Sequence, residues 1–162
     1  MKLIDRKTDR ANLAKLMSLF PVTAILGPRQ CGKSTLGRSL KADAYFDLEN
    51  PRDIARLEHP QLALEELTGL IVIDEIQRLP DLFPLLRYLV DQGRDRKFVI
   101  LGSASRDLIR QSSESLAGRI AYCPLGGFRL SDVGPRALKA LWWRGDCPSP
   151  FWRRRTVTTS CG

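Results

Sequence analysis

Five short apolar runs alternate with segments of helical periodicity, and this alternation constrains the fold more than any other feature. The runs are VTAIL (22–26), AYFDL (44–48), LIVID (70–74), FVILG (98–102) and IAYCPL (120–125). Three of them are almost continuously apolar, which is typical of strands buried on both faces of a parallel sheet. The stretches between them are long enough for crossover helices. We therefore predict an α/β domain of three layers, a five-stranded parallel sheet flanked by helices.

The helical segments fall between the apolar runs, and some begin with a recognisable signal. Asn50 followed by Pro51 predicts a helix start, with the asparagine as cap and the proline in the first turn. Asp81 is a candidate cap for a later helix. The predicted helices cover residues 11–20, 33–40, 51–58, 61–67, 81–92 and 105–111.

The turn between the first run and the next helix has the pattern of a phosphate-binding loop. GPRQCGKS, residues 27–34, fits G-x-x-x-x-G-K-[ST] at every fixed position. Gly27 and Gly32 let the backbone turn tightly, so that its N–H groups face an anion. Lys33 would reach the β- and γ-phosphates, and the Ser34 hydroxyl would bind Mg²⁺. The predicted nucleotide-binding residues are Gly27, Pro28, Arg29, Gln30, Cys31, Gly32, Lys33, Ser34 and Thr35.

This interpretation competes with a simpler one, a glycine-rich turn that carries an exposed lysine. The order of elements favours the phosphate site, because an apolar run leads directly into the loop and a helical pattern leaves it. The fold predicted by loop and strands together is that of the P-loop NTPases.

Two adjacent acids end the third run, in LIVIDEIQRLP. Asp74 can hold magnesium directly or through water, and Glu75 can orient and deprotonate a water for attack on the γ-phosphate. Two solvated acids after a strand are the competing interpretation. The glutamate favours hydrolysis over transfer to a substrate. It also favours the P-loop proteins in which another strand lies between the phosphate-loop strand and the acidic strand.

That intervening strand would be FVILG, which ends before Ser103. The Ser103 hydroxyl is a candidate contact for the γ-phosphate or the attacking water, although a plain turn residue fits the pattern too. Gln77 and Arg78 are weaker candidates for the site than Ser103. Arg119 lies between a helical pattern and the last run, and a cation there could stabilise phosphoryl transfer in a neighbouring subunit. A surface arginine is the alternative.

The net charge of +8 raises the possibility of nucleic-acid binding. Residues 129–162, however, hold seven Lys/Arg against two Asp/Glu, so most of the excess lies in the last fifth of the chain. Charge alone supports only weak, salt-sensitive binding. The four cysteines have neither zinc-site nor disulfide spacing. No run of 18 apolar residues and no secretory leader is evident, so we expect a cytoplasmic protein without a membrane span.

Taken together, ILGPRQCGKST, YFDLENPRD, GLIVIDEIQRLPDLFPLLRYLVD, FVILGSAS, ESLAGRIAY and LGGFRLSDVG resemble a known family. This family comprises the prokaryotic AAA-type ATPases that carry a C-terminal domain of unknown function. The resemblance runs from about residue 10 to about residue 150. It implies strand order 5-1-4-3-2, and ATP with Mg²⁺ at a Walker A loop and Walker B acids. It also implies Ser103 as the γ-phosphate sensor and Arg119 as an arginine finger in a homo-oligomer. The protein partner stays unknown.

The resemblance divides the chain into three parts. Residues 1–128 match an AAA-type ATP-binding core, and residues 129–150 match the start of a segment leading to a missing C-terminal domain. Residues 151–162 include RRRTVTTSCG, which lacks apolar periodicity and predicts a disordered, aberrant tail from a frameshift or early stop. Such a truncation would expose an aromatic patch of Trp142, Trp143, Phe151 and Trp152. The alternative to an ATPase is therefore a truncated, non-catalytic fragment that binds nucleotide or serves as an interaction module.

Overall fold

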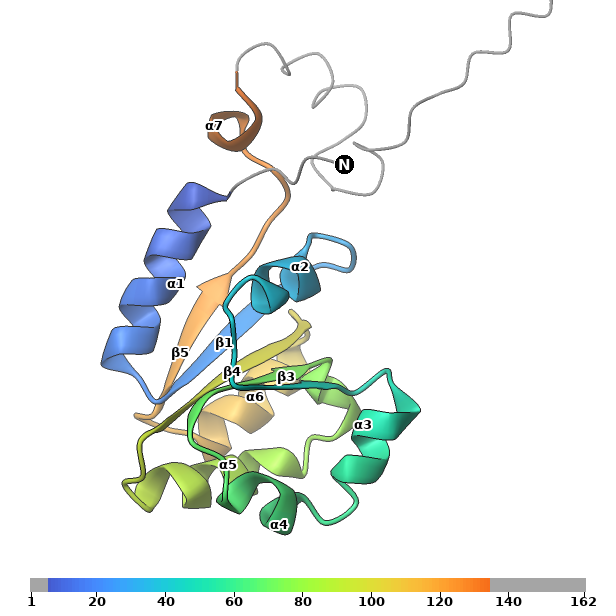
Figure 1. Ribbon diagram of the computed structural model, residues 1–162. Coiled ribbons are helices and arrows are strands. Elements are labelled where there is room, and N and C mark those ends of the chain that lie inside the picture. Colours follow the sequence, from blue (N-terminus) through green and yellow to red (C-terminus); the bar gives the residue numbers. More distant parts are fainter. Residues whose placement is uncertain (1–5, 135–162) are drawn as a thin grey trace, which may run out of the picture.

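A computed structural model of the protein describes residues 6–134 (Figure 1). The predicted tail, the aromatic patch and residues 135–150 of the predicted connecting segment lie outside the described residues. The elements in chain order are α1 (Lys7–Leu19), β1 (Val22–Gly27), α2 (Lys33–Arg38), β2 (Ala44–Asp47), α3 (Pro51–Arg56), α4 (Pro60–Glu65), β3 (Gly69–Asp74), the 3₁₀ turn η1 (Ile76–Arg78), α5 (Leu82–Asp91), β4 (Arg96–Ser103), α6 (Arg106–Ser115), β5 (Ile120–Pro124) and α7 (Leu130–Val133).

The five strands form one parallel sheet in the order β2-β3-β4-β1-β5. Read from the other edge, this is the order 5-1-4-3-2, so the predicted fold class and strand order are confirmed. The register pairs Gly27 with Ser103 and Asp47 with Asp74. The carboxyl ends of β1, β2, β3 and β4 therefore meet at one edge of the sheet, where ligands bind in open α/β folds.

Helices cover both faces of the sheet, as the continuously apolar strands predicted (Figure 1). Every residue of β1 is buried. Val22, Ala24 and Leu26 pack into the larger core with side chains of α4, α5 and α6. Ile25 points to the other face and packs against α1 and α2. The alternation of side chains along β1 thus ties the two helical layers to the strand that carries the phosphate loop.

The helix starts show which local signals decide a boundary. The Asn50 side chain accepts a hydrogen bond from the Arg52 N–H at 3.1 Å, so the predicted cap is confirmed. The prediction that the Asp81 side chain caps the following helix is wrong. Asp81 precedes α5 but has helical backbone angles, and its side chain makes no capping hydrogen bond. Backbone carbonyls of the preceding turn, at Leu79 and Pro80, take the first N–H groups instead.

Within residues 6–134, no helix has the length and apolar character needed to cross a membrane.

Candidate functional site

The phosphate loop joins β1 to α2 and has an unusual backbone. Gln30 and Gly32 have φ values of 62° and 96°, in the left-handed region, with Cys31 between them. Alternating residues of opposite hand turn successive N–H groups toward one side, which makes a concave site for an anion. Gly27 cannot be enlarged here, because a Cβ would clash with the carbonyl oxygen of Leu125. The glycine thus permits close packing of the loop against the end of β5.

The Lys33 side chain lies across this loop. Its Nζ donates hydrogen bonds to the carbonyl oxygens of Gly27 at 3.1 Å and Pro28 at 2.9 Å. The residue is 5% exposed, so the ammonium is held in place by the loop itself. Its carbonyl partners leave the third ammonium proton for another acceptor.

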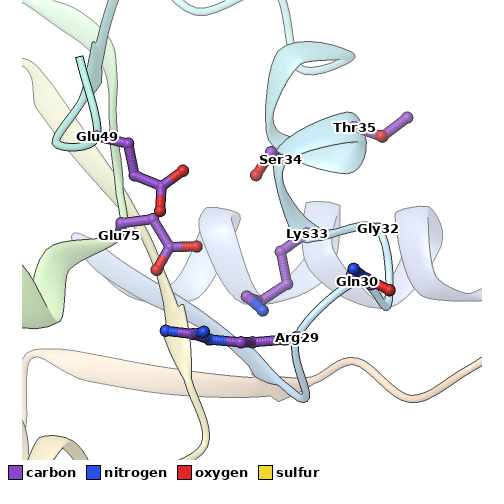
Figure 2. A pocket seen from close by; sticks show the side chains of 8 residues that line it. All are labelled: Arg29, Gln30, Gly32, Lys33, Ser34, Thr35, Glu49 and Glu75. Carbon is purple, nitrogen blue, oxygen red and sulfur yellow. The ribbon is translucent and has the colours of Figure 1, made fainter. Parts of the chain in front are cut away.

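A pocket opens beside the loop (Figure 2). It is lined by Arg29, Gln30, Gly32, Lys33, Ser34, Thr35, Glu49 and Glu75. Most of the residues predicted to bind nucleotide therefore line one pocket. Cys31 does not, because its side chain is buried in the core behind the loop.

Glu75 and Glu49 face Lys33 and Ser34 across the pocket (Figure 2). Glu75 has φ 58° and ψ 43°, a left-handed conformation that is uncommon for a residue with a side chain. Strained backbone of this kind concentrates at functional sites. Glu49 was missed by the sequence analysis. Its signal was its position two residues after β2, at the ligand-binding edge of the sheet.

Asp74 lies at the end of β3 and is 1% exposed. Its Oδ2 accepts a hydrogen bond from the Tyr45 hydroxyl at 2.7 Å, and its Oδ1 accepts the Glu75 N–H at 3.0 Å. Burial, followed by the hydrogen bond to Asp74, raises the pKa of the Tyr45 phenol above its ordinary value. Tyr45 is therefore a neutral donor that holds one carboxylate oxygen, a role that the sequence did not indicate.

The chemistry of these donors fits Mg²⁺. The pocket lining offers the Ser34 hydroxyl and the carboxylates of Glu75 and Glu49, all of them hard oxygen ligands. Asp74, the predicted magnesium ligand, does not line the pocket and lies buried at the end of β3, next to Glu75. Within residues 6–134, no three acidic, histidine or cysteine side chains form a cage for a metal ion. Mg²⁺ prefers such sparse sites, because it keeps several waters and takes phosphate oxygens of a bound nucleotide.

Ser103 ends β4, next to the strand of the phosphate loop. Its N–H donates to the Oε1 of Gln77 at 3.4 Å, and the Nε2 of Gln77 donates to Oε2 of Glu75. The predicted sensor position and the predicted base are thus joined through one side chain.

Arg119 lies elsewhere. Its carbonyl oxygen accepts the N–H of Val22, at the start of β1, whereas the phosphate loop follows the end of that strand. Val22 and Gly27 are five residues apart along β1, a distance of about 17 Å at the rise of a strand. Arg119 makes two hydrogen bonds to Asp91, from Nε at 2.6 Å and Nη2 at 3.0 Å. In its own chain it is therefore remote from the pocket.

A buried charged group supports the phosphate loop from behind. Arg6, which is 6% exposed, donates from Nη2 to the Cys31 carbonyl oxygen at 2.8 Å and from Nη1 to Asp9 at 3.1 Å. Its guanidinium also lies 4.7 Å from the centre of the Phe128 ring, and Asp9 pairs with Arg129 at 3.3 Å. The start of α1 and the segment after β5 are thus tied to the loop.

The fold and this site define a P-loop NTPase of the AAA type. A sequence profile of the AAA domain family matches residues 19–133, and the chain belongs to that family. Two mycobacterial proteins described as uncharacterized, Mb2031c of Mycobacterium bovis and Rv2008c of Mycobacterium tuberculosis, are each 49% identical over 171 aligned positions. The alignment covers 97% of this chain but 39% of each relative. The chain therefore spans well under half the length of these proteins.

Solved structures show the same fold at low sequence identity. The Walker-type ATPase PABY2304 of Pyrococcus abyssi superposes with a TM-score of 0.65 at 18% identity, covering 93% of this chain and 65% of that one. AMPPCP-bound DnaA from Aquifex aeolicus gives a TM-score of 0.57 at 12% identity, with coverages of 90% and 57%.

Proposed function

We propose that this chain is the core of an AAA-type ATPase, which binds ATP with Mg²⁺ and hydrolyses it. The observation that carries the proposal is the position of Glu75, whose carboxylate faces Lys33 and Ser34 across the pocket beside the phosphate loop (Figure 2). A carboxylate next to a phosphate site can accept a proton from water, which is the step that separates hydrolysis from binding. The solved structure of DnaA with AMPPCP supports a triphosphate as ligand for this fold.

Each residue then has a distinct role. The N–H groups of residues 29–34 and the Lys33 ammonium bind the phosphate oxygens. Ser34 and Asp74 would hold Mg²⁺, which neutralises negative charge on the phosphates when bound. Glu75 orients a water and takes its proton, while Ser103 contacts the γ-phosphate.

Arg119 completes the proposal in an oligomer. It is remote from its own pocket, so it can act only on the nucleotide of a neighbouring copy. A cation supplied in this way stabilises the charge that develops in phosphoryl transfer. Turnover per chain should therefore rise with protein concentration and fall in Arg119→Ala.

The test is Mg²⁺-dependent phosphate release from ATP, measured beside nucleotide binding. The informative variants are Lys33→Ala and Glu75→Gln. Lys15→Ala and Glu58→Gln are matched controls, because both side chains are exposed and lie outside the pocket. We expect Lys33→Ala to weaken binding, and Glu75→Gln to bind ATP but release phosphate only at a small residual rate. Both controls should behave like the wild type.

Two other outcomes decide between the alternatives. Binding without turnover in the wild type at every protein concentration would identify a non-catalytic nucleotide-binding fragment. Turnover that Glu75→Gln retains at the wild-type rate would show that another group activates the water.

Nucleic-acid stimulation is the second candidate, and the net charge of +8 is the observation that favours it. Stimulation of phosphate release by DNA should then disappear as salt rises, because phosphate contacts release counterions. Turnover that is indifferent to DNA at low salt would remove this candidate.

A further inference from the structure

The turn that follows β3 holds Glu75 in a fixed but unfavourable conformation. The left-handed backbone at Glu75 is locked on one side by its N–H, which donates to Asp74, and on the other by the fully buried side chain of Ile76. The carbonyl oxygen of Glu75 accepts the N–H of Arg78 at 2.9 Å, which closes the 3₁₀ turn. The backbone is therefore anchored, but the Glu75 side chain still needs a partner to keep one rotamer.

Gln77 supplies that partner. Its Nε2 donates to Oε2 of Glu75, and its Oε1 accepts the Ser103 N–H. A primary amide suits this place because it offers a donor and an acceptor on opposite sides of one group. A glutamate at 77 would put a second carboxylate against Glu75, and a methionine would fill the space without either hydrogen bond.

The neighbouring strand leaves room for this amide. A Cβ on Gly102 would lie 2.9 Å from Oε1 of Gln77 and 2.7 Å from the Leu108 Cδ2 atom. Glycine at the end of β4 therefore lets the amide reach the backbone of the next residue, Ser103. The bridge connects the turn after β3 to the end of β4, and its hydrogen bond from Ser103 to Gln77 spans 26 residues of sequence.

We propose that Gln77 is a positioning residue, which holds the Glu75 carboxylate in the phosphate pocket and couples it to the end of β4. The inference rests on the proposed function, in which Glu75 activates water and Ser103 contacts the γ-phosphate. Gln77 occupies one oxygen of Glu75 and leaves the other for water. A shift of Ser103 toward a bound γ-phosphate is then transmitted to Glu75 through the amide.

The catalytic test compares Gln77→Met with Gln111→Met, a control on the exposed face of α6. We expect Gln77→Met to lower kcat about 10- to 100-fold, the loss typical of a small displacement of a reacting group. KM and the Kd for ATP should stay within about twofold, because the Gln77 amide makes its hydrogen bonds to Glu75 and Ser103 and not to the phosphate loop. Gln77→Asn, which keeps an amide on a shorter stem, should recover part of the rate.

A double-mutant cycle separates positioning from a merely structural role. In the Glu75→Gln background, Gln77→Met should reduce the residual rate no further, because the residue that it positions is already disabled. A multiplicative loss in the double variant would show that Gln77 acts independently of Glu75, and would overturn the proposal. So would a wild-type kcat in Gln77→Met.

An NMR measurement tests the bridge even if the wild type proves not to turn over ATP. The side-chain amide signal of Gln77 is identified by its loss in Gln77→Met of the ¹⁵N-labelled full chain. Glu75→Ala should shift that signal upfield, and Gln77→Met should shift the backbone amide of Ser103. Unmoved signals in both variants would overturn the bridge. Absent turnover with moved signals would instead refute the proposed function and keep the bridge.

Discussion

Replacement of Arg6 by methionine tests whether the phosphate loop depends on the charged group behind it. Arg6 donates to the Cys31 carbonyl oxygen and to Asp9, and both residues of the ion pair are more than nine-tenths buried. Methionine retains much of the side-chain volume, so the change removes charge and hydrogen bonds rather than packing.

The cost follows from what remains after the substitution. Removal of one partner from a buried ion pair typically costs about 3–5 kcal/mol, because the other charge is left without compensation. Asp9 keeps Arg129 at 3.3 Å, but that side chain is 55% exposed and compensates only in part. We therefore expect a loss near the lower end, about 3 kcal/mol in the free energy of unfolding. For a chain of this length, this corresponds to a fall in Tm of about 6–12 °C.

The assay is thermal and urea unfolding of the full chain, with Arg110→Met as the matched control. Arg110 pairs with Asp107 at the same spacing of three residues, but the two side chains are 67% and 84% exposed. An exposed pair contributes at most about 1 kcal/mol, so the control should unfold almost like the wild type. ATP should also stabilise Arg6→Met less than the control, since its loop is less well ordered. Equal Tm values for the two variants would refute the argument.

Further predictions concern other parts of the molecule. Tyr45→Phe should lower the free energy of unfolding by about 1.5–3 kcal/mol in urea titrations, because the buried carboxylate of Asp74 loses the hydrogen bond that the Tyr45 hydroxyl donates to it. An unchanged midpoint would contradict this. Burial raises the pKa of the Cys123 thiol, so iodoacetamide should alkylate it far more slowly in the folded chain than in urea at the same pH, as followed by mass spectrometry. Asp91→Ala should leave the Tm almost unchanged although it removes both hydrogen bonds to Arg119, because the pair is exposed, and a large fall in Tm would show otherwise.

The Asp91 carboxyl also has a pH dependence whose sign is determined. The hydrogen bonds from Arg119 lower its pKa below the ordinary value. The pair therefore stabilises the fold at neutral pH, and this contribution is lost only as the pH falls through that lowered pKa. The small difference in Tm between wild type and Asp91→Ala should thus persist at neutral pH and vanish only in strong acid.

Local sequence was enough to predict the five strands, the helices α1 to α6 and the phosphate loop. The strand residues of β1 and β3 are mostly apolar because both faces of the sheet are covered, and an apolar run in the sequence is enough to predict such burial. The loop could be recognised because close approach to phosphate demands glycine, lysine and a hydroxyl at set spacings. The position of Asp74 and Glu75 after an apolar run likewise led to the prediction of their roles toward magnesium and water. These features depend on neighbours in the chain, so no tertiary contact was needed to see them.

Only the tertiary structure decided which side chains meet around the loop. Tyr45 reaches Asp74 across 29 positions of sequence, Arg6 reaches the Cys31 carbonyl across 25, and Gln77 reaches Ser103 across 26. No period of 2 or 3.6 encodes such contacts, because they depend on the strand order and on how each helix packs on the sheet. Asp81 fails as a cap for a related reason, since backbone carbonyls of the preceding turn had already taken the N–H groups. The sequence by itself determined what chemistry the loop can support, while the register of the parallel strands determined which residues hold it in place.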